Sequence, residues 1–362
     1  MAPITKPPPL SVQTVVDHVI KYFPFRRVEE DSVRELVSYD DRNYSFRGIL
    51  EGTATVQSFV FKVNHAEMPS DLVEGLNAIM NHVHSSGISC PVPLCSRQGS
   101  QTVALPHTEL LTWPSNVNQS ENMFCARVLT YITGTCAVVV KMTPKLLYDI
   151  GAFVGKLDYV LADFTHPVTD GRVYEWDIKH FMCVRESLVL LEDMTKRHLA
   201  ESVCTQVELN LVPRLKSLRH STIHGDCNEQ NLLVDPSTSV VCGIVDFGDC
   251  LRTCRVFELA ILTAYCMLLV TSDPIGMVAP VIAGYLDAYP LDPEELDVLY
   301  YAVLARLCKS VVTGYLTYLR DPSNSYVLTT QVAGWETIGT LLRVPKCEVD
   351  KVWFDDVTVC AP

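Results

Sequence analysis

The sequence predicts an α+β protein of two lobes, a small β-rich lobe over residues 1–132 and a larger, mainly helical lobe over residues 133–362. Up to about residue 132 the pattern is one of strand-like segments, with a single amphipathic helix after the third strand. Beyond it, apolar residues recur mostly at helical spacing. A chain of 362 residues is long enough to bury a core in each lobe.

The first lobe is expected to begin with a helix over residues 11–23, where a serine suits the N-cap and valines recur on one face. Strand character follows over residues 33–63, broken by polar turn residues at 38–45. The clearest strand is the third, residues 57–63, in which apolar residues alternate on both sides of Lys62.

A second helix is expected next, with Ser70 and Asp71 at its cap and apolar residues at helical spacing through Val83. Two strand-like segments at about 102–112 and 124–132 complete the lobe. The inserted helix therefore directly follows the third strand.

The second lobe is expected to begin with a long helix, because Thr143 and Pro144 suit the N-cap and first helical position. Two short strands at about 231–234 and 240–246 interrupt the helical pattern. Further helices are predicted near 177–195, 203–217, 255–270, 274–288, 293–319 and 326–342.

The composition excludes several classes of protein. A formal charge of −13 leaves no basic face for the phosphate backbone of nucleic acids. The 14 cysteines include no C-x-x-C pair, which argues against a zinc ribbon or thioredoxin-type site and fits reduced thiols. The N-terminus lacks the apolar segment of a signal peptide, and the longest apolar stretch, Val256–Val270, is short for a membrane span and contains Glu258. We expect a cytoplasmic protein that binds neither nucleic acid nor a membrane.

Oxygen-bearing side chains gather in two segments, 223–234 and 241–249. Asp226 and Asn231 stand five apart in a polar stretch between apolar ones, and Asp246 ends a short apolar strand. Hard divalent cations such as Mg²⁺ prefer oxygen ligands, and a further carboxylate can orient a hydroxyl group and accept its proton. Phosphoryl transfer requires this combination.

The pattern His224-Gly-Asp226-x₄-Asn231, followed by Asp246, resembles the catalytic and metal-binding loops of the aminoglycoside phosphotransferase-like small-molecule kinases. These are relatives of protein kinases, so the resemblance implies a protein-kinase-like two-lobe fold whose first lobe binds the nucleotide. It also implies that Asp226 is the catalytic base, that Asn231 and Asp246 bind Mg²⁺, and that His224 orients the loop. Taken singly, each residue is equally explained as a turn, cap or structural residue, but their joint order favours function.

The same resemblance gives the first lobe its own candidates. A kinase-like fold places a lysine on the third strand to bind the α- and β-phosphates, with a glutamate of the next helix as its partner. Lys62 and Glu74 occupy these positions, while Ser38 and Asn43 lie where a phosphate-covering loop would be. A solvent-facing lysine and a plain hairpin turn are the alternatives, and two other acids compete with Glu74, namely Glu67 and Asp71.

Within this family, several stretches resemble the subfamily that phosphorylates the hydroxyl group of 5-hydroxy-L-lysine, with GTP as the donor. The stretches are Ser38–Asp41, Phe61–Val63, Leu129–Tyr131, Leu146–Gly151, His224–Asp226, Asp246–Asp249, Phe257–Glu258 and Gly334–Trp335. The side chains cannot separate GTP from ATP. A pocket for this cationic amino acid must pair two ammonium groups and one carboxylate. The candidates for it are Asp249, Glu258, Trp176 and Trp335, each with a structural role as its alternative.

Other functions stay open at this point. The acceptor could be another small amino alcohol, such as homoserine, choline or an aminoglycoside-like molecule. A catalytically inactive nucleotide-binding module is disfavoured, because Asp226, Asn231, Asp246 and Lys62 are all present. A protein kinase is disfavoured by the absence of a G-x-G-x-x-G loop and by the helical insertion at about 143–217. The oligomeric state is undetermined.

Overall fold

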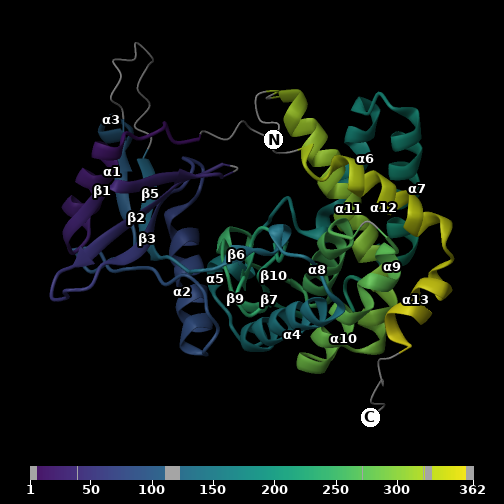
Figure 1. The fold of residues 1–362 in the computed structure, drawn as a ribbon. Coiled ribbons are helices and arrows are strands. Elements are labelled where there is room, and N and C mark those ends of the chain that lie inside the picture. Colours follow the sequence, from purple (N-terminus) through teal and green to yellow (C-terminus); the bar gives the residue numbers. More distant parts are fainter. Residues whose placement is uncertain are drawn as a thin grey trace. The chain divides into compact units, whose positions relative to one another are not determined.

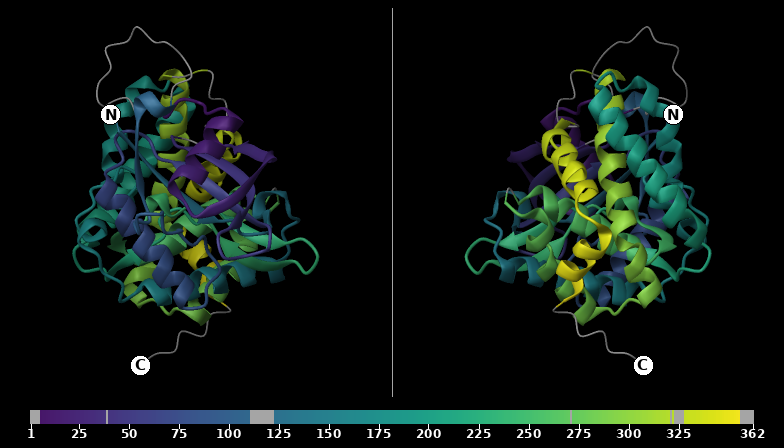
Figure 2. Two further views of the ribbon diagram at one scale, coloured as in Figure 1. Left: turned by 90° about the vertical axis from the view of Figure 1, so that its left-hand side faces the viewer. Right: turned by 90° about the vertical axis from the view of Figure 1, so that its right-hand side faces the viewer.

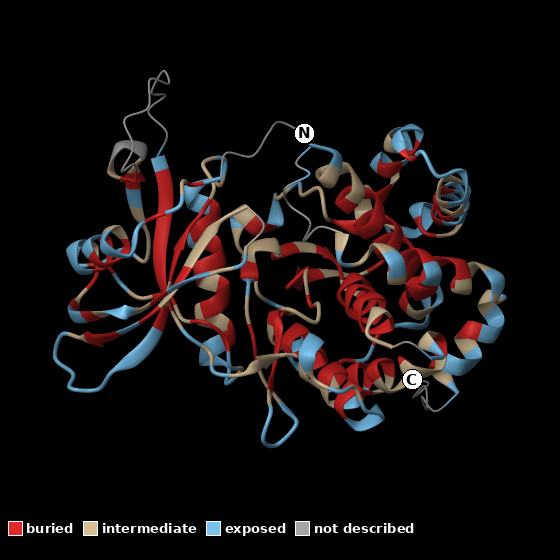
Figure 3. Cartoon of the chain, turned by 45° about the horizontal axis from the view of Figure 1, so that its top comes forward, coloured by how far each residue is buried: buried red, intermediate tan, exposed pale blue. Residues whose placement is uncertain are grey.

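The structure is a computed structural model that describes residues 6–38, 40–110, 123–270, 272–320, 322 and 328–355. The chain divides into two compact units, Met1–Thr133 and Gly134–Pro362 (Figure 1). The first contains an antiparallel sheet and the second is mainly helical, which confirms the predicted α+β class. Buried residues, red in Figure 3, gather in the interior of each unit.

Five antiparallel strands form the sheet of the first unit, in the order β1-β2-β3-β5-β4. They are β1 (Phe25–Leu36), β2 (Arg42–Leu50), β3 (Gln57–Val63), β4 (Val103–Pro106) and β5 (Met123–Thr130). The first helix is confirmed as α1 (Val12–Tyr22), since the Ser11 side chain accepts from the Thr14 N–H. One face of the sheet packs in a core with α1, where the Phe25 ring meets the Phe59 ring edge-on at 4.9 Å. Aromatic pairing of this kind adds to the apolar burial.

Several predicted boundaries in the first unit are wrong. The strand β1 begins at Phe25 and not at residue 33, and β2 begins at Arg42, within the turn expected at 38–45. The helix α2 (Ser70–Ser85) has Pro69 at its N-cap without a side-chain hydrogen bond, because Asp71 accepts instead from the neighbouring Leu72 N–H. The strand expected over 102–112 ends at Pro106 and is followed by the short helix α3 (His107–Leu110). Proline cannot donate to a strand ladder, which fits a strand end.

Two small sheets organise the centre of the second unit. One has the order β6-β8-β9, formed by Thr135–Cys136, Leu232–Asp235 and Val240–Ile244. The other pairs β7 (His220–Ile223) with β10 (Leu251–Cys254). The segments 224–231 and 245–250 are therefore loops with a strand at each end. The sequence did not predict β6, β7 or β10, because segments of two to four residues are too short to show a period.

Most of the second unit is helical. The longer helices are α4 (Pro144–Leu161), α7 (Met194–Asn210), α8 (Val256–Leu268), α10 (Ala279–Ala288), α11 (Pro293–Arg320), α12 (Gln331–Arg343) and α13 (Lys346–Phe354). Of these, α4 packs against both small sheets. The helix α11 contacts α7, α8, α12 and α13, and Figure 2 shows its yellow-green ribbon beside the yellow α12 and α13. Within the described ranges, no helix combines the length and apolar character needed to cross a membrane.

Two helices carry clear sequence signals that the structure confirms. Thr143 caps α4 by accepting from the Leu146 N–H at 3.2 Å. The helix α8 is buried from Val256 to Met267, as expected for an apolar segment inside a protein. Close packing of α4 on α10 explains Gly151, where an added Cβ would lie 2.0 Å from the Val281 carbonyl oxygen.

Other helix predictions in this unit are wrong in their bounds. The helix expected near 177–195 is a series of short pieces, namely 3₁₀ turns at Ile178–Cys183 and Leu188–Leu190 and the helix α6 (Val184–Ser187). The helix α7 starts at Met194 because Asp193 caps it, accepting from two backbone N–H groups. The short helix α5 (Pro167–Asp170) and α13 have no counterpart in the prediction. The single helix expected near 274–288 is divided into α9 (Pro274–Met277) and α10.

Candidate active site

Asp226 lies in the loop between β7 and β8, where both oxygens of its carboxylate accept hydrogen bonds. Oδ2 accepts from the side-chain amides of Asn228 at 2.9 Å and Asn231 at 2.8 Å. Oδ1 accepts from Nη2 of Arg306 at 2.9 Å. Burial raises the pKa of Asp226 to about 6, although the Arg306 charge acts in the opposite direction. With 22% of its side chain exposed, Asp226 is oriented yet accessible, as a group that accepts a proton from a bound hydroxyl must be.

Contacts behind the loop fix its backbone. Gly225 has φ +82°, and an added Cβ would lie 2.7 Å from the carbonyl oxygen of Asp249, so only glycine fits. Its N–H donates to Oε2 of Glu258 at 2.9 Å. Glu258 is 0% exposed in the first turn of α8, where a carboxylate is favoured by the helix dipole. The expectation that Glu258 lines a substrate pocket is therefore corrected, because its carboxylate supports the loop from behind.

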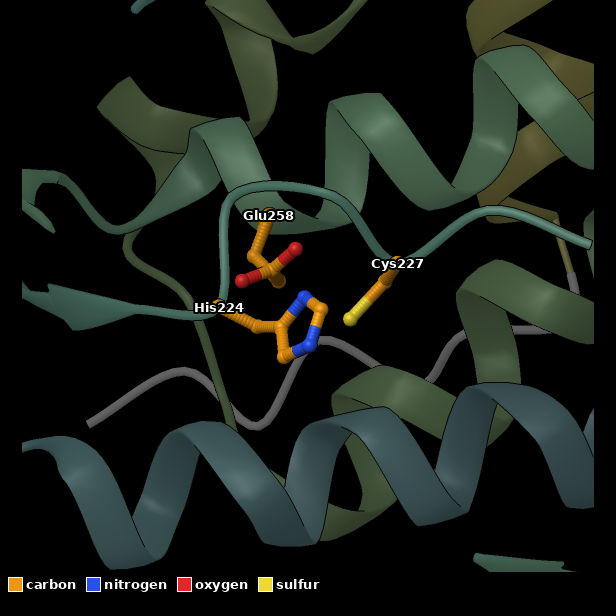
Figure 4. Close-up of side chains that lie close together, drawn as sticks. All are labelled: His224, Cys227 and Glu258. Carbon is orange, nitrogen blue, oxygen red and sulfur yellow. The ribbon is translucent and has the colours of Figure 1, made fainter. Parts of the chain in front are cut away.

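Figure 4 shows His224, Cys227 and Glu258 pointing toward one another, and one ligand-type atom of each lies within 4.8 Å of the others. The His224 ring contacts the Val245 carbonyl oxygen through Nε2 at 3.2 Å and accepts the Asp226 N–H at Nδ1 at 3.3 Å. Since backbone groups engage both ring nitrogens, we interpret this buried cluster as support for the loop, in line with the orienting role expected of His224.

Asn231 and Asp246 carry the oxygen atoms that suit a hard divalent cation. The Asn231 amide nitrogen donates to the backbone oxygen and Oδ2 of Asp226, which leaves its Oδ1 as a ligand atom. Asp246 is exposed just after β9, and its φ of +61° is a strained conformation for a non-glycine residue. The Val245 N–H donates to the Asn231 carbonyl at 2.9 Å and ties the two loops together. This donor set fits Mg²⁺.

In the first unit, Lys62 pairs with a different acid from the one expected. Its Nζ lies 3.0 Å from Oδ2 of Asp41, and both side chains are largely buried. Asp41 also accepts from Nδ2 of Asn64 at 3.0 Å and from the His65 N–H at 2.9 Å. Glu74 is exposed on α2. Asp41 is therefore an acidic partner of Lys62 that the kinase pattern did not predict.

The register of the sheet explains why Asp41 lies close to Lys62. Arg42 pairs with Val63, so Asp41, one residue before, lies beside the residues that follow β3. The Ser38 hydroxyl donates to the Asp41 carbonyl and closes the turn. Ser38 therefore has a local role in the structure, which differs from the expected contact with phosphate.

One face of this sheet carries a row of polar side chains. Asn43 on β2, Lys62 on β3 and Arg127 on β5 are direct register partners, so their side chains share a face. The Asn43 Oδ1 is buried without a hydrogen-bond partner among the described residues. Arg127 is 1% exposed and donates to Asn77 of α2. Sequence reasoning missed Arg127, although a lone cation in an apolar strand is the signal that selected Lys62.

Two of the predicted substrate residues lie near Asp226. The Tyr174 hydroxyl donates to Asp249 at 2.6 Å, and burial, together with the Asp226 charge, raises the pKa of Asp249 to about 6. The Trp176 ring lies 5.2 Å from the guanidinium of Arg306, which binds Asp226. The structure therefore brings Asp249 and Trp176 to the same side-chain cluster as Asp226.

Trp335 was predicted at the site and is a core residue, whereas Arg306 was not predicted and contacts Asp226. Trp335 is buried on α12, and its indole N–H donates to Gln331 one turn earlier, which fits a core residue. Arg306 was not predicted, since it lies in an apolar stretch of α11, 80 residues from Asp226. Its signal was a charged residue on the buried face of a helix.

Comparison with known proteins also indicates a phosphotransferase. Residues 37–299 match the phosphotransferase enzyme family. A hydroxylysine kinase of Xenopus laevis is 29% identical over 339 residues, which cover 90% of this chain and 88% of that protein. A hydroxylysine kinase of Danio rerio is 30% identical over 331 residues, covering 89% of each.

The fold is also found among solved structures. An amicoumacin kinase in complex with AMP-PNP, Ca²⁺ and Ami superimposes with a TM-score of 0.67 at 15% identity, covering 92% of this chain and 94% of that one. At this identity the likeness concerns the fold alone. Taken with the sequence matches, it shows that the chain belongs to the phosphotransferase enzyme family, as a kinase that transfers a phosphoryl group to a hydroxyl group of a small molecule.

Proposed function

We propose that this kinase phosphorylates the side-chain hydroxyl of 5-hydroxy-L-lysine, with GTP as the phosphoryl donor and Mg²⁺ as the metal. The observation that carries the proposal is the Asp226 carboxylate, held by Asn231 on one oxygen and by Arg306 on the other. It is accessible, and oxygen ligands for a cation adjoin it. The hydroxylysine kinases that are similar to this chain extend over nearly its whole length, which supports the choice of acceptor.

In the proposed mechanism, Asp226 orients the acceptor hydroxyl and takes its proton. The hydroxyl oxygen forms a bond to the γ-phosphorus while the bond from that phosphorus to the β-phosphate oxygen breaks, and the nucleoside diphosphate leaves. Asn231 and Asp246 hold Mg²⁺, which neutralises negative charge on the phosphates when bound. Lys62, positioned by Asp41, binds the α- and β-phosphates, and Asn43 faces the same side of its sheet. Rate enhancement comes mainly from positioning and electrostatics.

The charges around Asp226 suit a cationic amino acid. Asp249 offers a second carboxylate, and Trp176 offers an aromatic face, which attracts an ammonium group. Two ammonium groups of 5-hydroxylysine require acidic partners of this kind. Homoserine, choline and aminoglycosides are the competing acceptors, and ATP is the competing donor.

The experiment is phosphoryl transfer from γ-labelled GTP and, in parallel, γ-labelled ATP to 5-hydroxylysine, homoserine, choline and an aminoglycoside. We expect labelled phosphohydroxylysine that requires Mg²⁺, forms faster with GTP, and is lost in Asp226→Ala. Transfer to another acceptor would overturn the substrate and leave the kinase activity. Faster transfer from ATP would overturn the donor alone.

A further inference from the structure

We infer that Arg306 anchors the carboxylate of the acceptor, so that the enzyme selects amino alcohols that are also amino acids. This inference rests on the proposed function, since it assigns a partner to one group of the proposed substrate. It concerns the second unit alone, where the long helix α11 brings Arg306 to the catalytic loop.

Arg306 is a buried cation whose charge is paired with Asp226, while one of its N–H donors has no acceptor among the described residues. The side chain is 2% exposed, and its guanidinium lies 5.2 Å from the ring centroids of Trp176 and Tyr265. Nη1 donates to the Trp176 carbonyl at a long 3.4 Å, and Nε is buried without a hydrogen-bond partner in the described part of the chain. Guanidinium has five N–H donors, and a buried donor without an acceptor costs free energy. A site with spare donors of this kind suits a planar anion.

The position of Arg306 indicates which reactant it meets. Asp226 turns Oδ2 toward Asn231, a proposed metal ligand, and Oδ1 toward Arg306. The metal accompanies the phosphates of the donor. We therefore place the acceptor carboxylate on the Arg306 side of Asp226, because the proposed metal ligand Asn231 occupies the other oxygen.

The nearby charges make a carboxylate the fitting anion. Asp226 and Asp249 supply negative charge for ammonium groups, and Arg306 adds a positive charge beside them. Lys309, one turn further along α11, directs its ammonium to the Cys183 sulfur at 3.7 Å. Arginine binds a carboxylate through two parallel N–H groups, which lysine cannot do. An acceptor with an α-carboxylate and ammonium groups matches this arrangement of charges, and choline does not.

A comparison of two acceptors tests the inference. The first is 5-hydroxylysine, and the second is 1,5-diaminopentan-2-ol, which is the same molecule without its carboxylate. We expect wild-type kcat/KM to favour 5-hydroxylysine by about 10- to 100-fold, as for charge-assisted hydrogen bonds. In Arg306→Gln this preference should fall to within about threefold, because the partner of the carboxylate is gone. Arg197→Gln is the control, since Arg197 binds backbone carbonyls around Leu191 and should keep the wild-type preference.

The ratio of kcat/KM for the two acceptors separates recognition of the carboxylate from positioning of Asp226. Arg306→Gln also removes a partner of Asp226, so kcat should fall for both acceptors, but only recognition of the carboxylate changes their ratio. An unchanged ratio, with 5-hydroxylysine phosphorylated by the wild type, would overturn the inference and leave the proposed function. If the wild type phosphorylates neither acceptor, the proposed function itself fails.

A second measurement needs no variant and covers the case in which Arg306→Gln does not fold. L-lysine and its decarboxylated form, 1,5-diaminopentane, carry no hydroxyl, so we expect them to compete with 5-hydroxylysine without being phosphorylated. We expect L-lysine to bind at least about tenfold more tightly, because it keeps the carboxylate. Equal inhibition by the two would refute the role of Arg306.

Discussion

The geometry of the ion pair between Lys62 and Asp41 predicts how much stability and activity a substitution of Asp41 should remove. Asp41→Asn keeps the shape of the side chain and removes its charge. Oδ2 of Asp41 lies 3.0 Å from both the Lys62 Nζ and the Asn64 Nδ2, and Oδ1 accepts from the His65 N–H. An asparagine has one oxygen, so in either orientation its amide nitrogen would face a donor. The substitution therefore removes an ion pair and a hydrogen bond together.

The magnitude is that of a buried pair. The side chains of Lys62 and Asp41 are 8% and 13% exposed, so water replaces the lost partners poorly. Breaking one partner of a buried ion pair costs about 3–5 kcal/mol. We expect the free energy of unfolding of the first unit to fall by about 3 kcal/mol, and kcat/KM for the nucleotide to fall by about 10- to 100-fold as Lys62 loses its fixed position.

Denaturant unfolding and steady-state kinetics with varied nucleotide measure the two effects. Asp31→Asn is the matched control, because Asp31 is an exposed acid on β1 of the same unit and should leave both quantities unchanged. Tighter nucleotide binding by Asp41→Asn would refute the reasoning, since it would mean that Asp41 competes with the phosphates for Lys62.

Three further substitutions test the second unit. Asp226→Ala should lower kcat by about 10²- to 10⁴-fold, the usual contribution of a general base, with nucleotide affinity by calorimetry nearly unchanged; wild-type turnover would remove Asp226 from the role. In Asp246→Ala, activity should no longer reach a plateau as the Mg²⁺ concentration is raised. A magnesium titration that matches the wild type would contradict the assignment of Asp246 as a metal ligand. Gly225→Ala should destabilise the loop by at least about 1–2 kcal/mol and suppress kcat, because alanine resists the left-handed backbone. Unfolding and kinetic measurements that match the wild type would show that the loop tolerates a Cβ.

The sequence predicted the parts of the site that are contiguous in the chain. His224, Asp226 and Asn231 fall within one loop, so their spacing alone places them together. Alternation along β3 likewise indicated that Lys62 is enclosed by apolar neighbours. The fold class followed from the change of period between the two halves of the chain.

Partners that are distant in the chain could not be predicted in the same way. The pairing of Lys62 with Asp41 depends on the register of β2 on β3, which a single sequence does not specify. Arg306 reaches Asp226 only through the packing of α11 beside α8. An acid close in sequence to the metal loop can lie on the substrate side of the catalytic loop or behind it, so Glu258 was a reasonable substrate candidate. Only the path of α8 places it behind the catalytic loop, where it accepts from the Gly225 N–H.

The hydrogen bond from Gly225 to Glu258 links the catalytic loop to a helix that has almost no exposed surface. The loop cannot change its backbone at this point unless α8 also shifts, and α8 is packed on several sides. The free energy of opening the loop locally should therefore approach the free energy of unfolding the interior of the second unit. On heating, loss of activity and loss of the second unit's tertiary structure should occur in one transition, with amide exchange at Gly225 as slow as that of the helix core.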